Sequence, residues 1–360
     1  MSKDELYMHR CIELALNGAG HVSPNPMVGA VIVHNNKIIG EGWHQKFGEA
    51  HAEINAINSV ADKSLLSEST IYVNLEPCSH FGKTPPCVDA IIKHQFKKVV
   101  VGMLDPFEKV AGNGMKRLRL ANRSISEGRD EGMKVEENVL QKECEELNKR
   151  FITFHTQKQP YIILKWAQTS DGFISPDATK MSAAEFEENR HITGFIVQKL
   201  VHKWRTEEDA IMIGTNTAVS DNPALNARAY AGRNPIRIVI DRTLRIPSNY
   251  KIFDHSQPTI IFTEKQKPAE HNLQFIQIDF GKNMAQQIAQ QLYNQNIQSV
   301  IIEGGLQTLQ TFIAAGLWNE AQIFTSPKYL VTGIKAPDIT GKIIHQNSID
   351  NNRLTIYKNQ

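Results

Sequence analysis

The sequence predicts an α/β protein of two domains, and three observations support this fold class. The chain has 360 residues, whereas a single domain usually has about 150. Apolar and β-branched runs alternate with helical patterns in both halves, as expected when helices cover a sheet. A short polar link at residues 155–159 separates the halves. The predicted domains are therefore residues 1–150 and 157–360.

The first domain is predicted to open with a helix and a β-hairpin. Ser2 and Glu5 form a capping-box pattern, and apolar residues at helical spacing follow between residues 6 and 16. A strand is predicted at residues 28–33. The turn-forming residues 34–37 lead back into a second strand, which is typical of a hairpin.

Two helices and two strands are predicted to continue this domain. A helical pattern begins at His51, and residues 70–75 form a β-branched run typical of a buried strand. The next helix is predicted over residues 87–94, because Pro86 suits the first turn of a helix. A strand over residues 98–103 follows. This order is typical of a compact α/β sandwich.

The segment that ends the first domain is heavily charged. Residues 112–150 show a helical pattern, and the clear turn signals within it are Gly128 and Gly132. A final helix is predicted over residues 143–154. We therefore expect this segment to be helical.

The second domain is predicted to alternate strands with helices. Strands are indicated at residues 161–166, 210–213, 236–240, 259–262, 275–278, 299–302 and 321–325. Helices are predicted near residues 194–205, 283–294 and 306–315. Such alternation favours a largely parallel sheet covered by helices.

Composition excludes several classes of protein. The chain has 40 Lys and Arg against 38 Asp and Glu, so it lacks the basic excess of a nucleic-acid-binding protein. Four cysteines do not make a disulfide framework, which fits a reducing cytoplasm. Neither a signal-peptide pattern nor a run of membrane-spanning length is found. We expect a cytoplasmic protein that binds small molecules, and neither nucleic acid nor membrane.

Residues 51–87 carry the strongest chemical signal in the sequence. His51 offers an imidazole, and Cys78 and Cys87 offer two thiols. One nitrogen and two sulfur ligands with an open fourth position are typical of a catalytic zinc ion. With Glu53, the pattern follows the zinc-deaminase signature, except that eight residues separate the two cysteines. We expect one Zn²⁺ per chain, held by His51, Cys78 and Cys87.

The expected chemistry of this cluster is hydrolytic deamination. Zinc lowers the pKa of a bound water to about 7, and Glu53 is the natural carrier of its proton to the leaving ammonia. Two alternatives stay open at this point. In one, His80 completes a closed structural zinc site. In the other, the cysteines are merely buried and His51 caps a helix.

The first half contains a set of short motifs, namely Pro24-Asn25-Pro26, Val28-Gly29, His51-Ala52-Glu53 and Pro77 to Cys87. These motifs resemble those of a known family, the bifunctional deaminase/reductase of riboflavin biosynthesis. The resemblance implies a cytidine-deaminase-like α/β/α sandwich. It also implies that Asn25, His80 and Lys83 contact the substrate, with a solvated loop lysine as the alternative for Lys83.

A strand-to-helix turn in the second half indicates a phosphate site. Residues 299–302 end in Glu303-Gly304-Gly305, which leads into a helix. Glycines at such a turn let a phosphate approach the N–H groups of the helix N-terminus, although tight turns use glycine for other reasons too. A Rossmann site is not indicated, because no Gly-x-Gly-x-x-Gly follows a strand.

The second half contains further motifs, namely Lys165-Trp166-Ala167, Ser170-Asp171-Gly172, Ile192-Thr193-Gly194, residues 201–205, residues 214–225 and Glu303-Gly304-Gly305. These motifs resemble the reductase half of the same family, which implies a dihydrofolate-reductase-like fold and the use of NADPH. The resemblance assigns NADPH binding to Ala167, His191, Thr217, Asp221, Gly305, Leu306, Gln307 and Thr308. It assigns substrate binding to Asn189, Arg205, Leu225, Arg228 and Glu303.

Arginine chemistry agrees with part of this assignment. A guanidinium binds a phosphate in bidentate fashion, so Arg205 and Arg228 suit a sugar phosphate; surface salt bridging is the alternative. The sequence departs from the family at two places. His191 stands where the family usually has tryptophan, and residues 119–137 are longer and more charged than the usual link.

The resemblance implies two successive reactions. The first is zinc-dependent hydrolytic deamination of 2,5-diamino-6-(5-phosphoribosylamino)pyrimidin-4(3H)-one, and the second is NADPH-dependent reduction of the ribosyl chain to ribityl. It also implies a homo-oligomer. Two other classes remain: a nucleic-acid deaminase, which the neutral charge and the long separation of the cysteines disfavour, and a non-catalytic binding protein stabilised by zinc.

Overall fold

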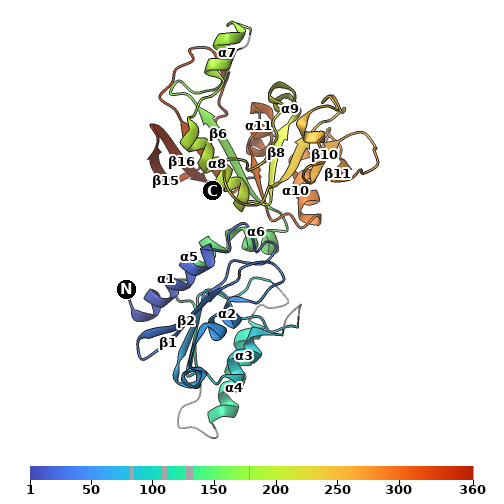
Figure 1. Cartoon of the computed structure of the whole chain (residues 1–360). Helices are drawn as coiled ribbons and strands as arrows, with labels where there is room; N and C mark the ends of the chain where they lie inside the picture. The colour runs from blue at the N-terminus through green and yellow to red at the C-terminus, as the bar shows by residue number, and fades with distance from the viewer. Residues whose placement is uncertain (82–84, 108–111, 127–132, 178, 360) are drawn as a thin grey trace. The chain divides into compact units, whose positions relative to one another are not determined.

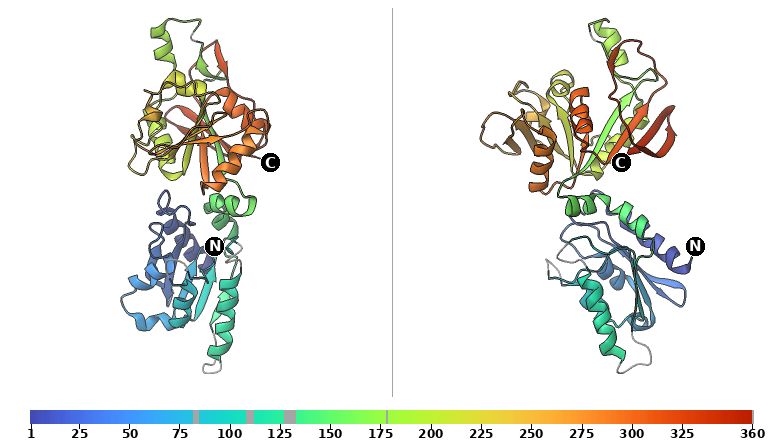
Figure 2. Two further views of the ribbon diagram at one scale, coloured as in Figure 1. Left: turned by 90° about the vertical axis from the view of Figure 1, so that its right-hand side faces the viewer. Right: turned by 180° about the vertical axis from the view of Figure 1, so that it is seen from behind.

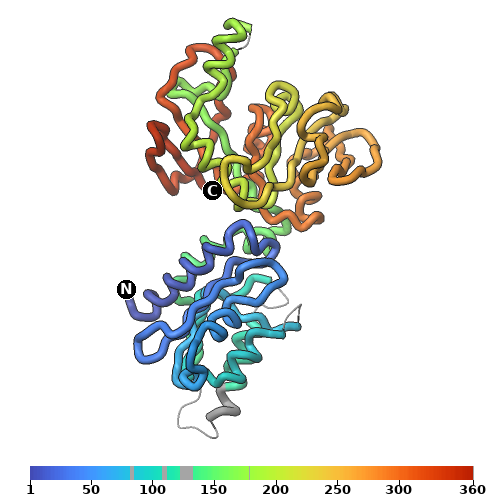
Figure 3. The backbone as a smooth tube through the Cα atoms, viewed as in Figure 1, coloured from blue at the N-terminus to red at the C-terminus, as the bar shows by residue number. Residues whose placement is uncertain are grey.

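The chain folds into two compact units, Met1–Lys158 and Gln159–Gln360 (Figure 1). The computed structural model describes residues 1–81, 85–107, 112–126, 133–177 and 179–359. The chain passes from one unit to the other once, after α6 (Lys149–Gln157; Figure 3). None of the described helices combines the length and the apolar character that a membrane span requires.

The first unit is built on a five-stranded sheet with the strand order β2-β1-β3-β4-β5. β1 is antiparallel to β2 and β3, whereas β3, β4 and β5 are parallel. The hairpin prediction is confirmed, with Asn35 and Asn36 at positive φ in its turn. The strands are β1 Gly29–His34, β2 Lys37–Trp43, β3 Thr70–Val73, β4 Lys98–Val101 and β5 Lys134–Glu136.

Helices cover both faces of this sheet (Figures 1 and 2). Along β1, Val31 and Val33 join the core formed with α1, whereas Ala30 and Ile32 join the core formed with α2 and α3. This alternation is the period-two pattern of a strand that is buried on both faces. The helices are α1 Lys3–Leu16, α2 Ala52–Ser59, the 3₁₀ helix η1 Lys63–Glu68, α3 Cys87–Lys93, α4 Asn113–Ser126 and α5 Gln141–Leu147.

The prediction of a helical pattern over residues 112–150, with turns at Gly128 and Gly132, was wrong in two respects. The short strand β5 pairs with β4 at the sheet edge, and its exposed–intermediate–exposed side chains give no apolar run to detect. The helix predicted over residues 143–154 divides into α5 and α6 at Asn148. Asn148 leaves helical geometry because its side chain bonds both the N–H and the carbonyl of Met27, at 2.9 and 3.0 Å. Gly128 and Gly132 lie outside the described residues.

The second unit contains a nine-stranded sheet, and the prediction of a largely parallel sheet is confirmed. The strand order is β11-β10-β9-β8-β12-β6-β13-β16-β15, parallel from β11 to β13, with β16 and β15 added antiparallel. These strands are β6 Tyr161–Gln168, β8 Ala210–Gly214, β9 Ile236–Ile240, β10 Thr259–Thr263, β11 Leu273–Gln277, β12 Ser299–Ile302, β13 Glu320–Thr325, β15 Lys342–Ile349 and β16 Asn352–Lys358. A separate ribbon pairs β7 Phe173–Pro176 with β14 Gly333–Lys335.

The helices of the second unit pack against this sheet and build its cores. α10 and α11 share one core with β6, β8, β9, β10 and β12, while α9 packs on the other side of β8. α8 packs on β13 and β16. The elements are α7 Ala183–Asn189, α8 Phe195–Glu207, α9 Thr215–Asp221, the 3₁₀ helix η2 Lys251–Phe253, α10 Met284–Asn294 and α11 Leu306–Ala314.

The order of the central strands positions the second site. β12 lies between β8 and β6, and all three are parallel. Their carboxyl ends therefore meet at one edge of the sheet, where parallel α/β sheets bind ligands. α9 follows β8 and α11 follows β12 at this edge.

Candidate active sites

Three elements of the first unit bring together the sulfur and nitrogen atoms that the sequence predicts as metal ligands. His51 is the N-cap residue of α2, Cys78 follows β3, and Cys87 is the first residue of α3. The Nδ1 of His51 lies 3.5 Å from Cys78 Sγ and 3.4 Å from Cys87 Sγ. The three ligand atoms all lie within 4.8 Å of one another.

This geometry fits a tetrahedral metal ion. Zn–S bonds of about 2.3 Å and Zn–N bonds of about 2.1 Å at a tetrahedral angle place nitrogen and sulfur about 3.6 Å apart. The two observed N···S separations agree with this value. His80 is exposed, and in the part of the chain that the structure describes it is not a member of the ligand cluster. The cluster therefore has the three protein ligands of an open site.

The electrostatics of the two thiols also favour a cation. The N–H of Cys87 donates to Cys78 Sγ at 3.3 Å. A hydrogen bond from the Cys87 thiol lowers the pKa of Cys78 to about 4, and the same interaction, with burial, raises the pKa of Cys87. Only one of the two sulfurs thus ionises readily by itself. A bound divalent cation would stabilise both thiolates.

Glu53 lies in the first turn of α2, beside this cluster. The residue is only 3% exposed, and among the described groups its Oε2 has no hydrogen-bond partner. Burial and the nearby Cys78 sulfur raise the pKa of Glu53 to about 7. An orphaned buried carboxylate oxygen is costly, and a carboxyl group that titrates near neutrality is suited to proton transfer.

Sequence reasoning missed Glu76, which precedes Pro77 and Cys78. Glu76 is buried, and its carboxylate accepts hydrogen bonds of 2.8–3.2 Å from the N–H groups of Asp105, Gly112, Gly114 and Met115. A Cβ at Gly114 would lie 2.3 Å from the Pro77 carbonyl oxygen, so glycine is required for this close approach. Glu76 thereby ties the start of α4 to the segment that carries Cys78. A carboxylate whose partners are backbone N–H groups of distant residues leaves no pattern in the sequence.

His44 was also missed, and it fixes the orientation of Asn25. The Nδ1 of His44 lies 3.1 Å from the Ala50 carbonyl oxygen, so Nδ1 carries the proton. Burial lowers the pKa of His44, which keeps the ring neutral, and Nε2 accepts a 3.1 Å hydrogen bond from the Asn25 amide. The His44 ring centroid lies 5.3 Å from that of His51. The Asn25 amide is thus held near the metal cluster with its NH₂ group committed to His44.

The other two predicted substrate residues of this half are His80 and Lys83. His80 lies on the surface of the segment that follows Cys78. Lys83 lies outside the described residues. Their roles stay predictions.

In the second unit, Arg205 and Glu303 form a buried ion pair. Arg205 lies on α8 and Glu303 directly follows β12. The Nε and one terminal nitrogen of Arg205 lie 3.1 and 2.8 Å from the two carboxylate oxygens of Glu303, a bidentate geometry. Burial raises the pKa of Glu303, but the charges of Arg205 and Lys165 outweigh it and lower the value to about 2.

Lys165 is a third charged member of this cluster that sequence reasoning did not assign. Its Nζ lies 4.0 Å from Glu303 Oε2, and its side chain is 15% exposed. Burial lowers the pKa of Lys165, and the Arg205 charge adds to this effect, although Glu303 opposes it. Lys165 on β6 belongs to the Lys165-Trp166-Ala167 motif, but no local pattern shows that Glu303 faces it from the end of β12.

The loop after α9 joins the predicted substrate residues to this ion pair. Leu225 is buried with φ of 49°, and the Asn226 carbonyl accepts a 3.0 Å hydrogen bond from Arg205. Arg228 is exposed and donates to the Asn226 side chain at 3.2 Å. The Asn189 amide instead donates to the Glu185 carbonyl within α7, so its role as a substrate contact stays a prediction.

Of the residues predicted to bind NADPH, those near the carboxyl edge of β6, β12 and β8 are Ala167, Thr217 and the turn from Gly305 to Thr308. Gly305 precedes α11 with φ of 62°, and a Cβ there would lie 2.9 Å from Thr217 Oγ1 at the start of α9. The turn therefore needs glycine and leaves the N–H groups of Leu306, Gln307 and Thr308 at the first turn of α11. Ala167 is in β6, on the opposite side of β12 from β8.

Asp221 and His191 are linked through Arg190. Arg190 donates to the Asp221 carboxylate at 3.3 Å, which connects the end of α7 with the end of α9. His191 is exposed, and its carbonyl accepts a 2.8 Å hydrogen bond from Lys328. The role of His191 in NADPH binding stays a prediction.

The burial of His202 is expected to make the free energy of unfolding of the second unit depend on pH. It is buried on α8 and accepts a 3.3 Å hydrogen bond from the Ala229 N–H. Burial and the charges of Arg205 and Arg228 lower its pKa to about 4. Because the unfolded chain binds this proton near pH 6.5, stability should fall by up to about 3 kcal/mol between pH 6.5 and 4.

We expect His202→Gln to flatten that dependence. The measurement is urea unfolding of the wild type and the variant at pH 4.5 and 7, followed by tryptophan fluorescence. This probe favours the second unit, which contains Trp166, Trp204 and Trp318 of the 4 tryptophans. An equal loss of stability in both proteins would show that His202 is not the group responsible.

Comparison with known proteins decides the family. Residues 1–103 match the family model of the cytidine and deoxycytidylate deaminase zinc-binding region, and residues 160–355 match that of the RibD C-terminal domain. The chain is 36% identical to the riboflavin biosynthesis protein RibD of Aquifex aeolicus (strain VF5) over 351 residues, which cover 96% of this chain and 92% of the relative. The chain belongs to the RibD family.

Further relatives agree with this membership in the RibD family. RibD of Bacillus amyloliquefaciens is 34% identical, with 93% of this chain and 87% of the relative covered. The crystal structure of a diaminohydroxyphosphoribosylaminopyrimidine deaminase/5-amino-6-(5-phosphoribosylamino)uracil reductase from Thermotoga maritima matches with a TM-score of 0.87 and 32% identity, over 99% of each chain. RibD of Acinetobacter baumannii matches with a TM-score of 0.85 and 29% identity, also over 99% of each chain.

Family membership confirms the predicted fold and general function. The first unit is a cytidine-deaminase-like domain, and the second is the reductase domain of RibD. As a member of the RibD family, the chain is a bifunctional deaminase/reductase of riboflavin biosynthesis. The rival predictions of a nucleic-acid deaminase and of a non-catalytic zinc protein are thereby wrong.

Proposed function

We propose that the first unit is a zinc-dependent deaminase of 2,5-diamino-6-(5-phosphoribosylamino)pyrimidin-4(3H)-one and that the second unit reduces the product with NADPH. The observation that carries the proposal is the His51, Cys78 and Cys87 cluster with the partnerless carboxylate oxygen of Glu53 close by. The two activities of the Thermotoga maritima relative support the choice of substrates.

In the deaminase half, the three ligand residues would hold one zinc ion. Zinc, when bound, lowers the pKa of a coordinated water to about 7. Glu53 would accept the proton of that water at Oε2 and deliver it to the amino nitrogen that leaves as ammonia. Water thus replaces the 2-amino group, and the ring carbon becomes a carbonyl. Asn25, His80 and Lys83 would hold the substrate.

In the reductase half, the turn from Gly305 to Thr308 would hold an NADPH phosphate, because N–H groups at the start of a helix bind anions. Ala167, His191, Thr217 and Asp221 would complete the NADPH site. NADPH would supply the hydride, and solvent would supply the proton, for the conversion of the ribosyl chain to ribityl.

The substrate of the reductase half would lie at Arg205, Leu225, Glu303 and Arg228, with Asn189 as a further predicted contact. The Glu303 carboxylate can accept hydrogen bonds from sugar hydroxyls. The exposed guanidinium of Arg228 suits the sugar phosphate.

The two-step reaction is tested with the purified protein and the diaminopyrimidine substrate, with and without NADPH. We expect ammonia in both mixtures. NADPH absorbance should fall only after ammonia has appeared. The proposal fails if no ammonia forms, or if NADPH is consumed at full rate before any deamination.

Zinc removal should separate the two activities. We expect a chelator to abolish ammonia release, while NADPH oxidation with 5-amino-6-(5-phosphoribosylamino)uracil continues, since only the first site needs the metal. Added Zn²⁺ should restore deamination. Cys78→Ala should purify without zinc, whereas Cys144→Ala, which removes a buried thiol outside the cluster, should keep one zinc per chain. A chelated protein that still releases ammonia would contradict the metal requirement.

We propose that each compact unit is a functional domain. The family resemblance further suggests that the protein is a homo-oligomer. Light scattering of the purified protein measures its assembly. A monomer at micromolar concentration would overturn this part of the proposal.

A further inference from the structure

We infer that Gln257 is a positioning residue for the reductase reaction, because it holds the loop of residues 222–229 in the shape that receives the substrate. The inference rests on the proposed function, which assigns Leu225 and Arg228 of this loop to the substrate. Gln257 itself is neither a predicted NADPH-binding residue nor a predicted substrate-binding residue.

Side chains from neighbouring elements hold the main chain of the 222–229 loop. The Leu225 carbonyl accepts from Gln257 at 3.2 Å, and the Asn226 carbonyl accepts from Arg205 at 3.0 Å. The Ala227 N–H donates to Asn234 at 2.9 Å, and the Ala229 N–H donates to His202 at 3.3 Å. A loop whose main chain is satisfied by side chains in place of water has its shape determined by those side chains.

The backbone of this loop needs such support. Asn222 and Leu225 have φ of 40° and 49°. Asparagine tolerates the left-handed region, but leucine rarely adopts it, and such residues persist only where the surroundings hold them. The Leu225 side chain is buried, and its carbonyl is held by Gln257. Gln257 is therefore placed at the strained point of the loop.

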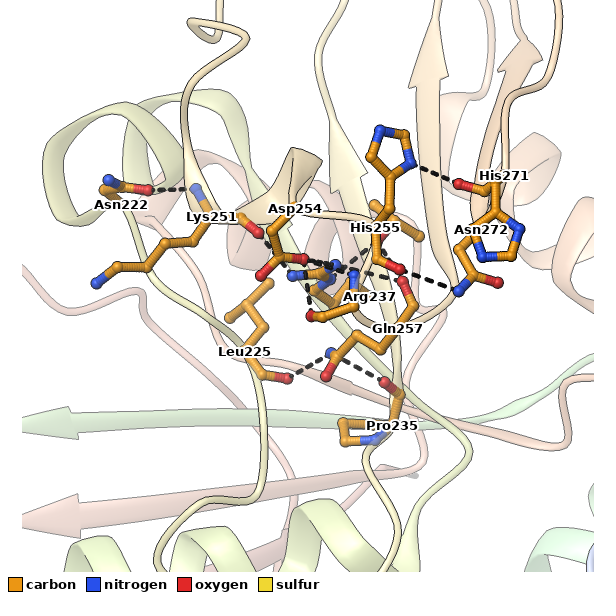
Figure 4. Close-up of polar contacts among 12 residues, drawn as sticks. Asn222, Leu225, Pro235, Arg237, Lys251, Asp254, His255, Gln257, His271 and Asn272 are labelled. Carbon is orange, nitrogen blue, oxygen red and sulfur yellow. Dashed lines mark hydrogen bonds and ion pairs between the residues drawn. The ribbon is translucent and has the colours of Figure 1, made fainter.

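Gln257 spans the distance between the loop and the sheet. It is 5% exposed, and its amide group donates both to the Leu225 carbonyl and to the Pro235 carbonyl, at 3.2 and 3.3 Å (Figure 4). Pro235 directly precedes β9. A single side-chain amide thus fixes the loop relative to the start of a central strand.

The main chain at Gln257 is itself fixed by Arg237 of β9, which is fully buried. One terminal nitrogen of Arg237 donates to the Gln257 carbonyl at 3.3 Å and to the Asp254 carboxylate at 2.7 Å (Figure 4). The other donates to the Lys251 carbonyl and Nε donates to Thr259, both at 2.8 Å. Gln257 therefore extends from a rigid base.

The position of this loop affects the substrate site through the Asn226 carbonyl, which is next to Leu225. Asn226 accepts from Arg205, which is in turn bidentate to Glu303. A shift of the loop at Leu225 would move both the Leu225 side chain and the partner that orients Arg205. Substrate binding should weaken, whereas NADPH binding at the start of α11 should not change.

The test uses the full-length enzyme with 5-amino-6-(5-phosphoribosylamino)uracil and saturating NADPH. Gln257→Leu removes both donors, and Gln257→Met removes them with the length of the side chain retained. We expect KM for the uracil substrate to rise about tenfold in both variants, with kcat within about twofold and the NADPH Kd unchanged. Hydrogen exchange at the Ala227 and Ala229 amides should accelerate.

The matched control is Gln287→Leu. Gln287 also binds main-chain groups of the second unit, since it accepts from the Asp279 N–H and donates to the Asp279 carbonyl. Asp279 belongs to a different loop, the one between β11 and α10. Its variant should keep the wild-type KM. The inference is overturned if both Gln257 variants keep the wild-type KM, or if Gln287→Leu raises KM equally. A wild-type enzyme that does not oxidise NADPH with this substrate would refute the proposed function itself.

Discussion

Glu53→Gln is expected to reduce ammonia release by about 10³-fold or more, because general acid–base catalysis contributes about 10² to 10⁴ and Glu53 would serve both proton transfers. Glutamine has nearly the same size but cannot carry a proton. The variant should keep one zinc ion per chain, since His51, Cys78 and Cys87 are unchanged. The measurement is the rate of ammonia release together with the zinc content.

Two controls belong to the Glu53 experiment. Glu68→Gln alters an exposed carboxylate of the same unit and should leave deamination unchanged. NADPH oxidation with the uracil substrate should also be unchanged in Glu53→Gln, because that activity belongs to the other unit. If Glu53→Gln deaminated at the wild-type rate, Glu53 would not be the proton carrier.

Arg205→Leu is expected to abolish reduction and to destabilise the second unit. The variant leaves the Glu303 carboxylate buried without its bidentate partner, and breaking a buried ion pair in this way costs about 3–5 kcal/mol. It also removes the donor to the Asn226 carbonyl. We expect NADPH oxidation to fall by at least about 10²-fold, while ammonia release persists.

A double variant separates the contribution of Arg205 to stability from its contribution to the reaction. Replacing both members of a buried ion pair is often close to neutral for stability. Arg205→Leu with Glu303→Gln should therefore recover much of the lost stability in urea unfolding, but not the reductase activity. Arg242→Leu breaks the exposed pair with Glu264 and should change neither quantity appreciably. A double variant that regains NADPH oxidation would show that the pair is only structural.

Much of the fold could be predicted from the sequence, because patterning and turn residues were consistent with each other. The buried strands β6, β8, β9, β10 and β12 have near-continuous apolar runs, as strands covered on both faces do. The sequence does not predict β15, because nearly all its side chains are exposed and they form no apolar pattern. The break between α5 and α6 at Asn148 depends on hydrogen bonds to Met27. No local sequence pattern indicates such a distant contact.

Among the site residues, too, those with a local sequence pattern could be predicted, and those that depend on distant partners could not. His51, Glu53, Cys78 and Cys87 could be predicted because metal chemistry restricts both residue type and spacing. Glu76, His44 and Gln257 act through backbone groups or through another side chain. Glutamate, histidine and glutamine are common in many other roles, so their functions become visible only when the fold brings their partners together.

The central proposal is an open zinc site beside a proton-carrying carboxylate, and a crystal structure of the zinc-loaded protein tests it most directly. We predict anomalous scattering from one zinc ion per chain, bound by His51 Nδ1, Cys78 Sγ and Cys87 Sγ, with the Glu53 carboxylate facing a fourth position that is free of protein atoms. A fourth protein ligand at the zinc, or a Glu53 side chain directed away from it, would contradict the account.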